Sequence, residues 1–290
     1  MWPARNFQLI LLLLTLVGCS GTTFIYNRLD FILPWYLDDY VDLNRGQDAF
    51  LDEQLAPFLA WHRMEELPRY LEILDDIDAT LDRDRDLTAS DIEAISLEIE
   101  RAWFRLEERG LDWLLALGGE LSEEQVQEFL AALWKKQEKY EKKYLERSDA
   151  EYREDSYDSL VDNLQDYLGK LDKSQKQLLE EASGRLIRSD ATWLSERGDW
   201  LRRLETLMQR QPGWEQRLRE ALASRSDTVS EEYVQLYEHN LQVIYTALAQ
   251  VFNSRTAKQD ERLRGRLANL RKDFQTLIEQ GREKGLAPAA

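Results

Sequence analysis

The spacing of apolar residues constrains this chain more than any other feature. Apolar side chains recur every three or four residues through three long series, residues 126–168, 178–207 and 234–277. This period lines one face of an α-helix. At 1.5 Å per residue, each series would form a helix of roughly 50 to 70 Å, the first with a kink near Ser148. The sequence therefore predicts an all-α protein, an extended bundle or array of long amphipathic helices.

Turn-forming residues are scarce, which argues against a strand-rich fold. The 290 residues include only thirteen Gly and six Pro, too few for the turns of a sandwich or barrel. Upstream of the long series, the pattern predicts shorter helices, with Pro57 and Pro68 breaking them or opening turns. These helices are expected over residues 31–43, 47–61, 66–81 and 91–117.

Helix starts share one local pattern. An apolar residue precedes a capping side chain, and a polar residue or tyrosine follows three positions later, as in capping boxes. The cap positions are 34, 50 and 58 residues apart, too uneven for a tandem solenoid, so we interpret them as independent helix starts. The four sites are Leu87-Thr88 with Asp91, Leu121-Ser122 with Gln125, Leu171-Asp172 with Gln175, and Val229-Ser230 with Tyr233.

The N-terminus resembles a bacterial lipoprotein signal peptide. Residues 1–19 read MWPARNFQLILLLLTLVGC, with Arg5, an apolar run over 7–17, then Gly18 and Cys19. The run is about half the roughly twenty residues that a membrane-spanning helix needs. We expect cleavage after Gly18 and lipidation of Cys19, the only cysteine of the chain. Without a second cysteine, the body cannot form an internal disulfide.

This interpretation also predicts a location. In the enterobacterial sorting rule, Asp after the lipidated cysteine signals retention at the inner membrane, and here the residue is Ser20. No later segment approaches eighteen consecutive apolar residues. We therefore expect a protein tethered to the bacterial outer membrane by its acyl chains, facing the periplasm, with the membrane as one partner.

Charge is abundant and unevenly distributed. The chain has 55 Asp and Glu against 38 Lys and Arg, a net charge of −17, which excludes nucleic acid as an expected partner. Residues 30–120 hold 24 acidic and 8 basic side chains, whereas residues 255–290 hold 9 basic and 5 acidic ones. The two segments could dock on each other, or both could be solvated faces that keep the protein in solution.

The pattern predicts four regions. Residues 1–18 would be the signal peptide, and residues 19–45 the lipidated N-terminus with a short linker helix. Residues 46–120 would form an acidic helical subdomain, and residues 121–285 the long-helix bundle.

One acidic segment partly matches a calcium-binding loop. Asp82, Asp84, Asp86 and Glu93 occupy positions 1, 3, 5 and 12 of the template. Position 6 normally requires Gly for its sharp turn, and here it is Leu87. The competing interpretation is an acidic linker ahead of the Thr88 cap.

Residue patterns of common catalytic sites are missing. The chain has two histidines, and the residues three positions before them are Leu59 and Leu236 rather than the Glu of a di-iron bundle. There is no Gly-rich phosphate loop, G-x-S-x-G or H-E-x-x-H motif. His62 and Glu66 could share a helix face and bind a surface metal, or form an ion pair or a buried imidazole. We expect no cofactor and no enzymatic activity.

Aromatic residues are frequent at helical spacing. Core packing explains most of them, and an exposed groove for a partner helix or an unfolded client is the alternative. The tryptophans in question include Trp61, Trp103, Trp113, Trp134, Trp193 and Trp200.

Two stretches carry a resemblance to a known family. After the lipidation motif, FIYNRLDFILPWYLDDYVDLNRGQ and WHRMEELPRY resemble a family of gammaproteobacterial lipoproteins whose domain has no known function. The resemblance implies the same envelope location and an all-helical fold, and it implies no activity. Leu121-Ser122-x-x-Gln125 and Leu171-Asp172-x-x-Gln175 also resemble the L-T-x-x-Q helix starts of small periplasmic chaperones of the envelope-stress type.

The leading hypothesis is a non-enzymatic envelope scaffold or adaptor that binds another protein. Its candidate surface is a mixture of aromatic and charged residues beside a helix break; a structural corner held by ion pairs of Arg63 and Glu66 is the competing interpretation. The alternative functions are a tethered chaperone for unfolded clients, and an enzyme acting on peptidoglycan through carboxylates. The candidate surface residues are Trp61, His62, Arg63, Glu66, Pro68 and Tyr70.

Overall fold

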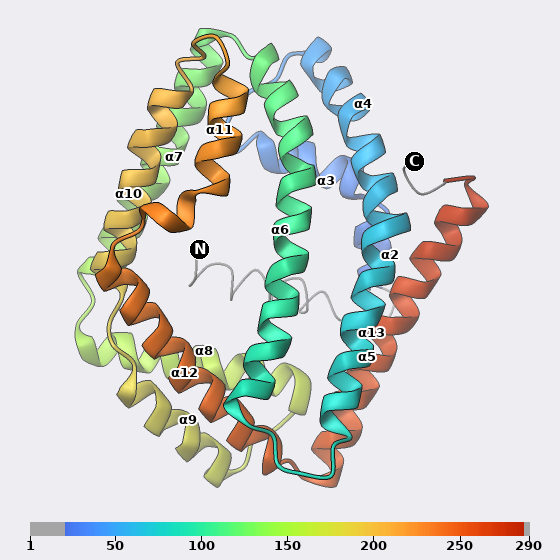
Figure 1. Cartoon of the computed structure of the whole chain (residues 1–290), viewed down its shortest axis with the longest axis vertical. Coiled ribbons are helices and arrows are strands. Elements are labelled where there is room, and N and C mark those ends of the chain that lie inside the picture. The colour runs from blue at the N-terminus through green and yellow to red at the C-terminus, as the bar shows by residue number, and fades with distance from the viewer. Residues whose placement is uncertain (1–20, 287–290) are drawn as a thin grey trace.

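A computed structural model describes residues 21–286, and within this range every regular element is helical (Figure 1). The predicted all-α fold is confirmed. The α-helices are α2 Gly21–Tyr26, α3 Leu29–Leu37, α4 Arg45–Trp61, α5 Leu67–Leu81, α6 Ala89–Glu120, α7 Glu123–Leu145, α8 Asp149–Leu168, α9 Lys173–Arg185, α10 Asp190–Leu207, α11 Trp214–Ala223, α12 Glu231–Asn253 and α13 Ala257–Glu283. A π-helical turn, His62–Glu66, joins α4 to α5, and a 3₁₀ turn, Arg225–Thr228, precedes α12.

The four predicted helix starts all carry a cap. Thr88, Ser122 and Asp172 each accept a hydrogen bond from the backbone three residues on, and the side chain there accepts one in return. Ser230 accepts from the Tyr233 amide without the return bond, because a tyrosine lacks the short acceptor of Asp, Glu or Gln.

Each of the three long predicted helices is two helices in the structure. The first breaks at Ser148, which forms a capping box with Glu151, and the third breaks at Thr256, which forms one with Gln259. The second breaks at residues 186–189, where the Asn240 amide accepts from the Ile187 N–H at 2.8 Å and donates to its carbonyl at 2.8 Å. The apolar period continues across all three short breaks, so periodicity alone predicted helices that are too long.

Helices pack against partners that are distant in sequence. α6 pairs with α12, α5 with α13, and α7 with α10. The consecutive helices α8 and α9 also pack on each other. Figure 1 shows α6 through the middle of the array, with α4, α5 and α13 on one side and α7, α10 and α11 on the other. Thus α5 and α6, from the predicted acidic subdomain, pack on α13 and α12, from the predicted long-helix bundle.

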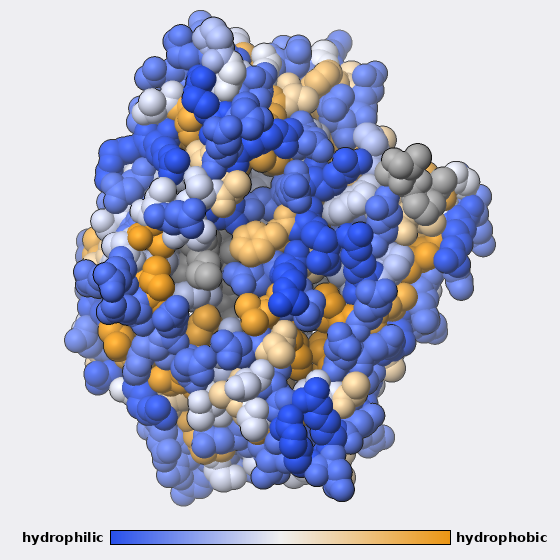
Figure 2. Space-filling view, viewed as in Figure 1, coloured by the Kyte–Doolittle hydropathy of each residue, from blue (hydrophilic) through white to orange (hydrophobic). Residues whose placement is uncertain are grey.

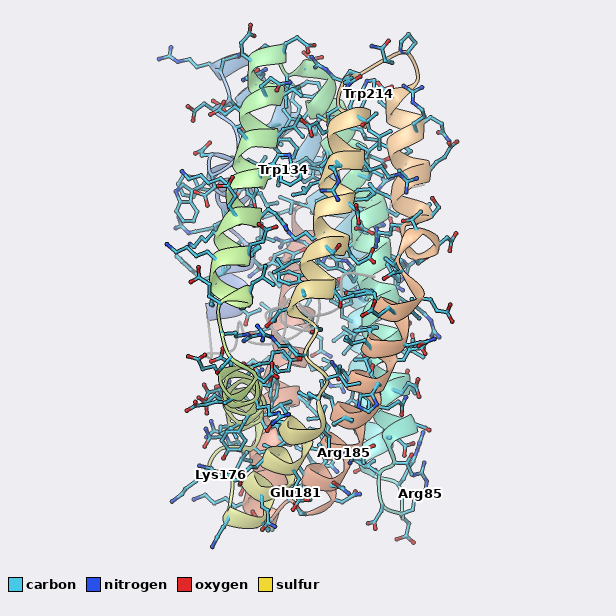
Figure 3. All side chains as sticks on the ribbon, turned by 90° about the vertical axis from the view of Figure 1, so that its left-hand side faces the viewer. Arg85, Trp134, Lys176, Glu181, Arg185 and Trp214 are labelled. Atoms are coloured by element: carbon cyan, nitrogen blue, oxygen red, sulfur yellow. The ribbon has the colours of Figure 1, made fainter. Side chains whose placement is uncertain are left out.

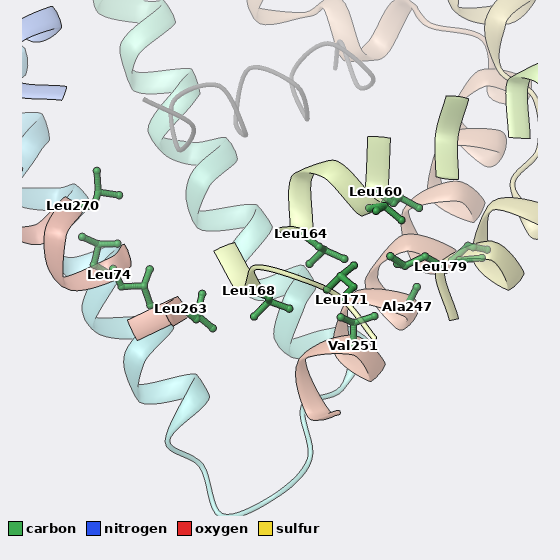
Figure 4. Packing of buried hydrophobic residues seen from close by; sticks show 14 residues of the cluster. Leu74, Leu160, Leu164, Leu168, Leu171, Leu179, Ala247, Val251, Leu263 and Leu270 are labelled. Carbon is green, nitrogen blue, oxygen red and sulfur yellow. The ribbon is translucent and has the colours of Figure 1, made fainter. Parts of the chain in front are cut away.

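The largest hydrophobic core lies where α5, α8, α9, α12 and α13 meet (Figure 4). Leucines dominate it, and Leu179 and Val251 are completely buried. Burial of one such side chain stabilises the fold by roughly 1.5–3 kcal/mol. Its buried members are Leu74, Leu160, Val161, Leu164, Leu168, Leu171, Leu179, Ala182, Val243, Ala247, Val251, Leu263, Leu267 and Leu270.

The acidic and basic segments dock as one of the two sequence hypotheses proposed. Arg271 of α13 contacts Asp75 and Asp78 of α5, with 2.8 Å from Nη2 to the Asp78 carboxylate. Arg264 reaches Asp82 at 2.7 Å. These side chains are partly exposed, so each pair contributes about 0–1 kcal/mol and less at high salt. They link α13 to α5 and to the residue that follows it, Asp82.

The outer surface is mainly charged and polar. Figure 2 shows hydrophilic side chains over most of one face, with apolar ones in the seams between helices. Charged side chains such as Glu181 and Arg185 on α9 point outward (Figure 3). Among the helices of residues 21–286, none combines the length and apolar character that a membrane span requires.

The caps at the helix breaks can be tested against a matched substitution within a helix. Thr256→Ala should lower the free energy of unfolding by about 1 kcal/mol, because the N–H of Gln259 loses its acceptor. Thr246→Ala, the same change inside α12, should alter it by less than about 0.5 kcal/mol, since Ala is a good helix former. Urea titration measures both; equal effects would contradict the assigned role of the cap.

Candidate functional site

The predicted partner surface is mostly buried, so its assignment as a surface is wrong. Trp61 is 9% exposed, His62 8%, Arg63 7% and Glu66 0%. Pro68 and Tyr70 are partly exposed. The pattern located a real cluster of polar and aromatic side chains, but α2, α6 and α13 cover it, and local sequence does not show which distant helices will do so.

The π-helical turn accommodates Pro68. In a regular α-helix the proline ring would clash with the carbonyl four residues earlier, and proline has no N–H to donate. The chain instead widens, and the Leu67 amide donates to the carbonyl of His62, five residues back. Pro68 then stands in the first turn of α5, where its missing donor costs least. Single π-helical turns of this kind are frequent at functional sites.

Glu66 ties this turn to α6. Its fully buried carboxylate accepts from Arg105 Nε at 3.0 and 3.1 Å and from Arg105 Nη2 at 2.5 Å. Arg69 Nη1 adds a third donor group at 3.2 Å. The corner is therefore held by ion pairs, as the structural interpretation expected, although Arg105 and Arg69, rather than Arg63, are the partners of Glu66.

His62 lies between two tyrosines. Its Nδ1 shares a hydrogen bond with the Tyr26 hydroxyl at 2.7 Å, and its Nε2 lies 3.4 Å from the Tyr70 hydroxyl. Burial, with a smaller contribution from the Arg63 charge, lowers the pKa of His62 to about 4. The imidazole is therefore neutral near pH 7, and a neutral imidazole offers one donor and one acceptor, one for each hydroxyl. Burial also raises the pKa of both Tyr26 and Tyr70.

Arg63 points away from Glu66, toward the end of α2 and toward α13. It donates to Asn27 Oδ1 at 2.7 Å and to the Leu277 carbonyl at 3.3 Å. Its guanidinium carbon lies 4.9 Å from the centre of the Tyr26 ring, a cation–π contact. Gly281 makes this approach possible, because a Cβ there would lie 2.7 Å from Arg63 Cδ.

Two further hydrogen bonds fasten α2 to α13. The Thr23 hydroxyl donates to Asp273 at 3.3 Å, and the Asn27 amide donates to Gln280 at 2.9 Å. We call the contacts of Thr23, Tyr26 and Asn27 with His62, Arg63, Asp273 and Gln280 the N-terminal latch. The predicted lipidation site, Cys19, and the signal peptide lie outside the described residues. The latch helix α2 starts two residues after Cys19.

The calcium-loop candidate does not assemble. Asp82 pairs with Arg264, and the backbone of Leu87, at the position that should make the sharp turn, is bound on both sides by the Asn253 amide at 2.8 and 2.9 Å. Residues 21–286 contain no group of three acidic, His or Cys side chains arranged to hold a metal. Asp82, Asp84, Asp86 and Glu93 thus belong to an acidic linker and a helix start, and the calcium interpretation is wrong.

Most of the described tryptophans are buried or half-buried, as expected from their spacing. Trp61, Trp113 and Trp214 are buried. The others named from the sequence are half-buried, namely Trp103, Trp134, Trp193 and Trp200; Trp134 and Trp214 can be located in Figure 3.

A group of exposed aromatic side chains lies on α2 and α3 and was not predicted from the sequence. Phe24 is 59% exposed, Phe31 72%, Trp35 67% and Tyr36 48%. We call these four residues the aromatic face. The signal that could have found them is the density of aromatic residues in the short segment directly after Cys19.

A small surface hollow between α10 and the start of α12 also combines aromatic and charged groups. Trp193, Trp200 and Tyr233 line it together with Arg203 and Glu196. Glu196 is engaged, since it accepts the Ser230 N–H that begins α12 at 3.0 Å. The hollow therefore has one carboxylate committed to helix capping.

A family model described as a family of unknown function (DUF6279) matches residues 39–234. The chain belongs to this family. No curated protein and no solved structure matches it. The family region contains the π-helical turn and its partner Arg105, whereas α2 and α13, which complete the N-terminal latch, lie outside the matched residues.

The pairing of Glu66 with Arg105 can be tested by double substitution. Arg105→Met should lower the free energy of unfolding by about 3 kcal/mol or more, because it leaves a buried carboxylate with one partly exposed partner. Glu66→Leu combined with Arg105→Met should recover most of that loss. Arg101→Met, on the same helix in an exposed pair with Glu98, is the matched control and should change stability by less than about 0.5 kcal/mol.

His62 should make stability depend on pH. At pH values between 6.5, the ordinary pKa of histidine, and about 4, the pKa of His62 in the folded protein, the unfolded chain binds a proton that the folded protein does not bind. The free energy of unfolding therefore falls as pH falls. From pH 7 to pH 5 this amounts to about 2 kcal/mol. The stability difference between native protein and His62→Gln should narrow by that amount, as measured by urea titration at both pH values. A stability difference that stays the same at both pH values would contradict the assignment to His62.

Proposed function

We propose that this protein is a lipid-anchored, non-enzymatic scaffold or adaptor of the bacterial envelope. In this proposal Cys19 carries the acyl chains, and the helical body faces the periplasm from the outer membrane. The body binds another envelope protein and transforms no substrate.

The observation that carries the proposal is the N-terminal latch. A lipoprotein that needs only to stay near a membrane can be joined to its lipid anchor by a flexible linker. Here the helix that begins two residues after Cys19 is bonded through Tyr26 and Asn27 to the π-helical turn and α13. The body is thereby held within a few residues of its attachment point. A short, fixed distance from the membrane serves a protein that must present a surface to a partner.

The chemistry of the buried carboxylates favours binding over catalysis. A general acid at neutral pH needs a raised carboxyl pKa and an unengaged proton. Glu66 is engaged by Arg105, and Asp190 is engaged by Arg147 at 2.6 Å and Arg188 at 2.9 Å. Hydrogen bonds from Arg85 hold the pKa of Asp91 well below its usual range. These groups are committed to structural ion pairs.

The distribution of exposed apolar residues favours an adaptor over a tethered chaperone. A chaperone holds unfolded clients on a broad apolar surface. Outside the aromatic face, the exposed large apolar residues are dispersed over α6, α7 and the loop before α10. They are Leu97, Phe104, Leu114, Leu145 and Ile187.

The anchor is tested by labelling cells with a fatty-acid analogue. The native protein should take up the label, lose residues 1–18 and fractionate with the outer membrane. Cys19→Ser should lose the label and remain uncleaved, because the thiol that accepts the lipid is gone. Ser20→Asp should keep the label and move to the inner membrane. Labelling of Cys19→Ser, or a native protein free of fatty acid, would refute the anchor.

The adaptor role is tested by crosslinking the native protein in intact envelopes, followed by mass spectrometry. One or a few envelope proteins in discrete crosslinked species support an adaptor. A broad collection of unrelated proteins would support the chaperone instead, and turnover of peptidoglycan fragments by the purified protein would overturn the non-enzymatic assignment.

A further inference from the structure

The aromatic face is a continuous feature of α2 and α3. Phe31 and Trp35 are four residues apart on α3, which places them on the same side of that helix. The Arg28 guanidinium lies 4.6 Å from the centre of the Phe24 ring and continues the face across the turn between the two helices. Phe24, Phe31 and Trp35 are the three most exposed large apolar residues described in the chain.

The exposure of these residues has a structural cause. The opposite sides of the same helices are already occupied, since Leu33 and Leu37 pack on the core formed by α4 and α6. Tyr26 is held in the N-terminal latch. The aromatic face thus points outward, while the partly buried Leu33 and Leu37 contact the core behind it. Large aromatic side chains fixed in water in this way indicate a surface that something else covers.

The position of the face identifies what covers it. Phe24 is five residues after Cys19, and five residues span at most about 18 Å even when fully extended. With an acylated Cys19 at the membrane, Phe24 and its neighbours must lie near the headgroups. The acyl chains and the aromatic face would then meet the same bilayer.

The chemistry of the face also matches a bilayer surface. Tryptophan and other aromatic side chains prefer the boundary between headgroups and acyl chains, and a cation beside them attracts anionic lipid. Arg28 supplies that cation. One carboxylate, Asp30, shares the segment and accepts the Phe31 N–H at 3.0 Å, and the exposed Asp38 and Asp39 mark where the face ends. The strongly acidic region that follows would be repelled by anionic lipid, which leaves α2 and α3 as the contact.

We propose that Phe24, Arg28, Phe31 and Trp35 form a membrane-resting face that lies in the headgroup region beside the lipid anchor. This inference rests on the proposed lipidation of Cys19. It assigns α2 and α3 a second role, because one side of these helices engages the body and the other engages phospholipid.

The chain offers a clean way to test the face. Cys19 is the only cysteine and would be blocked by its acyl chain, so one added cysteine becomes the only reactive thiol. Trp35→Cys is labelled with an environment-sensitive fluorophore in the acylated, processed protein. The protein is then placed in vesicles of phosphatidylethanolamine and phosphatidylglycerol. Leu145→Cys, 46% exposed at the end of α7, is the matched control.

The label at position 35 should shift its emission to the blue on addition of vesicles and should be quenched by nitroxide-bearing lipid, whereas the label at 145 should do neither. Arg28→Glu should weaken the quenching at position 35 in vesicles with phosphatidylglycerol and leave it unchanged in neutral phosphatidylcholine vesicles.

The outcomes distinguish failure of the membrane-resting face from failure of the proposed lipidation of Cys19. Mass spectrometry of the N-terminal peptide first reports the acyl chains; their absence would overturn both proposals. An acylated protein whose label at position 35 stays in water would overturn the membrane-resting face and leave the anchor standing. A blue shift without quenching by lipid would mean that a second copy or another protein covers the face, and it would overturn the assignment to lipid.

Discussion

The buried ion pair between Glu66 and Arg105 is the contact on which the rest of this arrangement depends. It fixes the π-helical turn against α6, and the geometry of that turn sends Arg63 in the opposite direction. Arg63 and His62 can then receive α2, and Arg63 also bonds the backbone of α13. A charge buried without a partner is costly, so loss of Arg105 would disturb the corner that α2 and α13 contact.

Two kinds of polar contact divide and close the array of helices. Capping boxes at Ser148 and Thr256 end helices that the apolar period would have continued, and each break lets the chain change direction. Charge pairs then return α13 along α5, as Arg271 reaches Asp75 and Asp78. Leucines dominate the largest core, and the polar contacts join the same helices at defined positions.

A structural feature was predictable from the sequence where the contact that determines it is local. The box of Thr88 and Asp91 was predictable, because all its atoms lie within four residues. The box of Thr256 and Gln259 obeys the same rule and was hidden within a long apolar period. The cluster from Trp61 to Tyr70 was located correctly but taken for a surface, because its burial depends on α2 and α13. Exposure of the aromatic face likewise depends on what fills the other side of α3.

The N-terminal latch and the aromatic face would together orient the body on the membrane. A lipid on Cys19 alone would restrain one point and leave the body free to tilt. Contact of Phe31 and Trp35 with the bilayer would add further points of attachment and limit the tilt of the body. Tyr26 and Asn27 would transmit that restraint to the π-helical turn and α13. The charged end of the array at α9 lies far from α3 in Figures 1 and 3, so it would project away from the membrane. In the proposed function, a partner would then contact the acidic, polar helices that lie beyond the membrane surface. The length of the helical array would set the distance between this partner and the membrane.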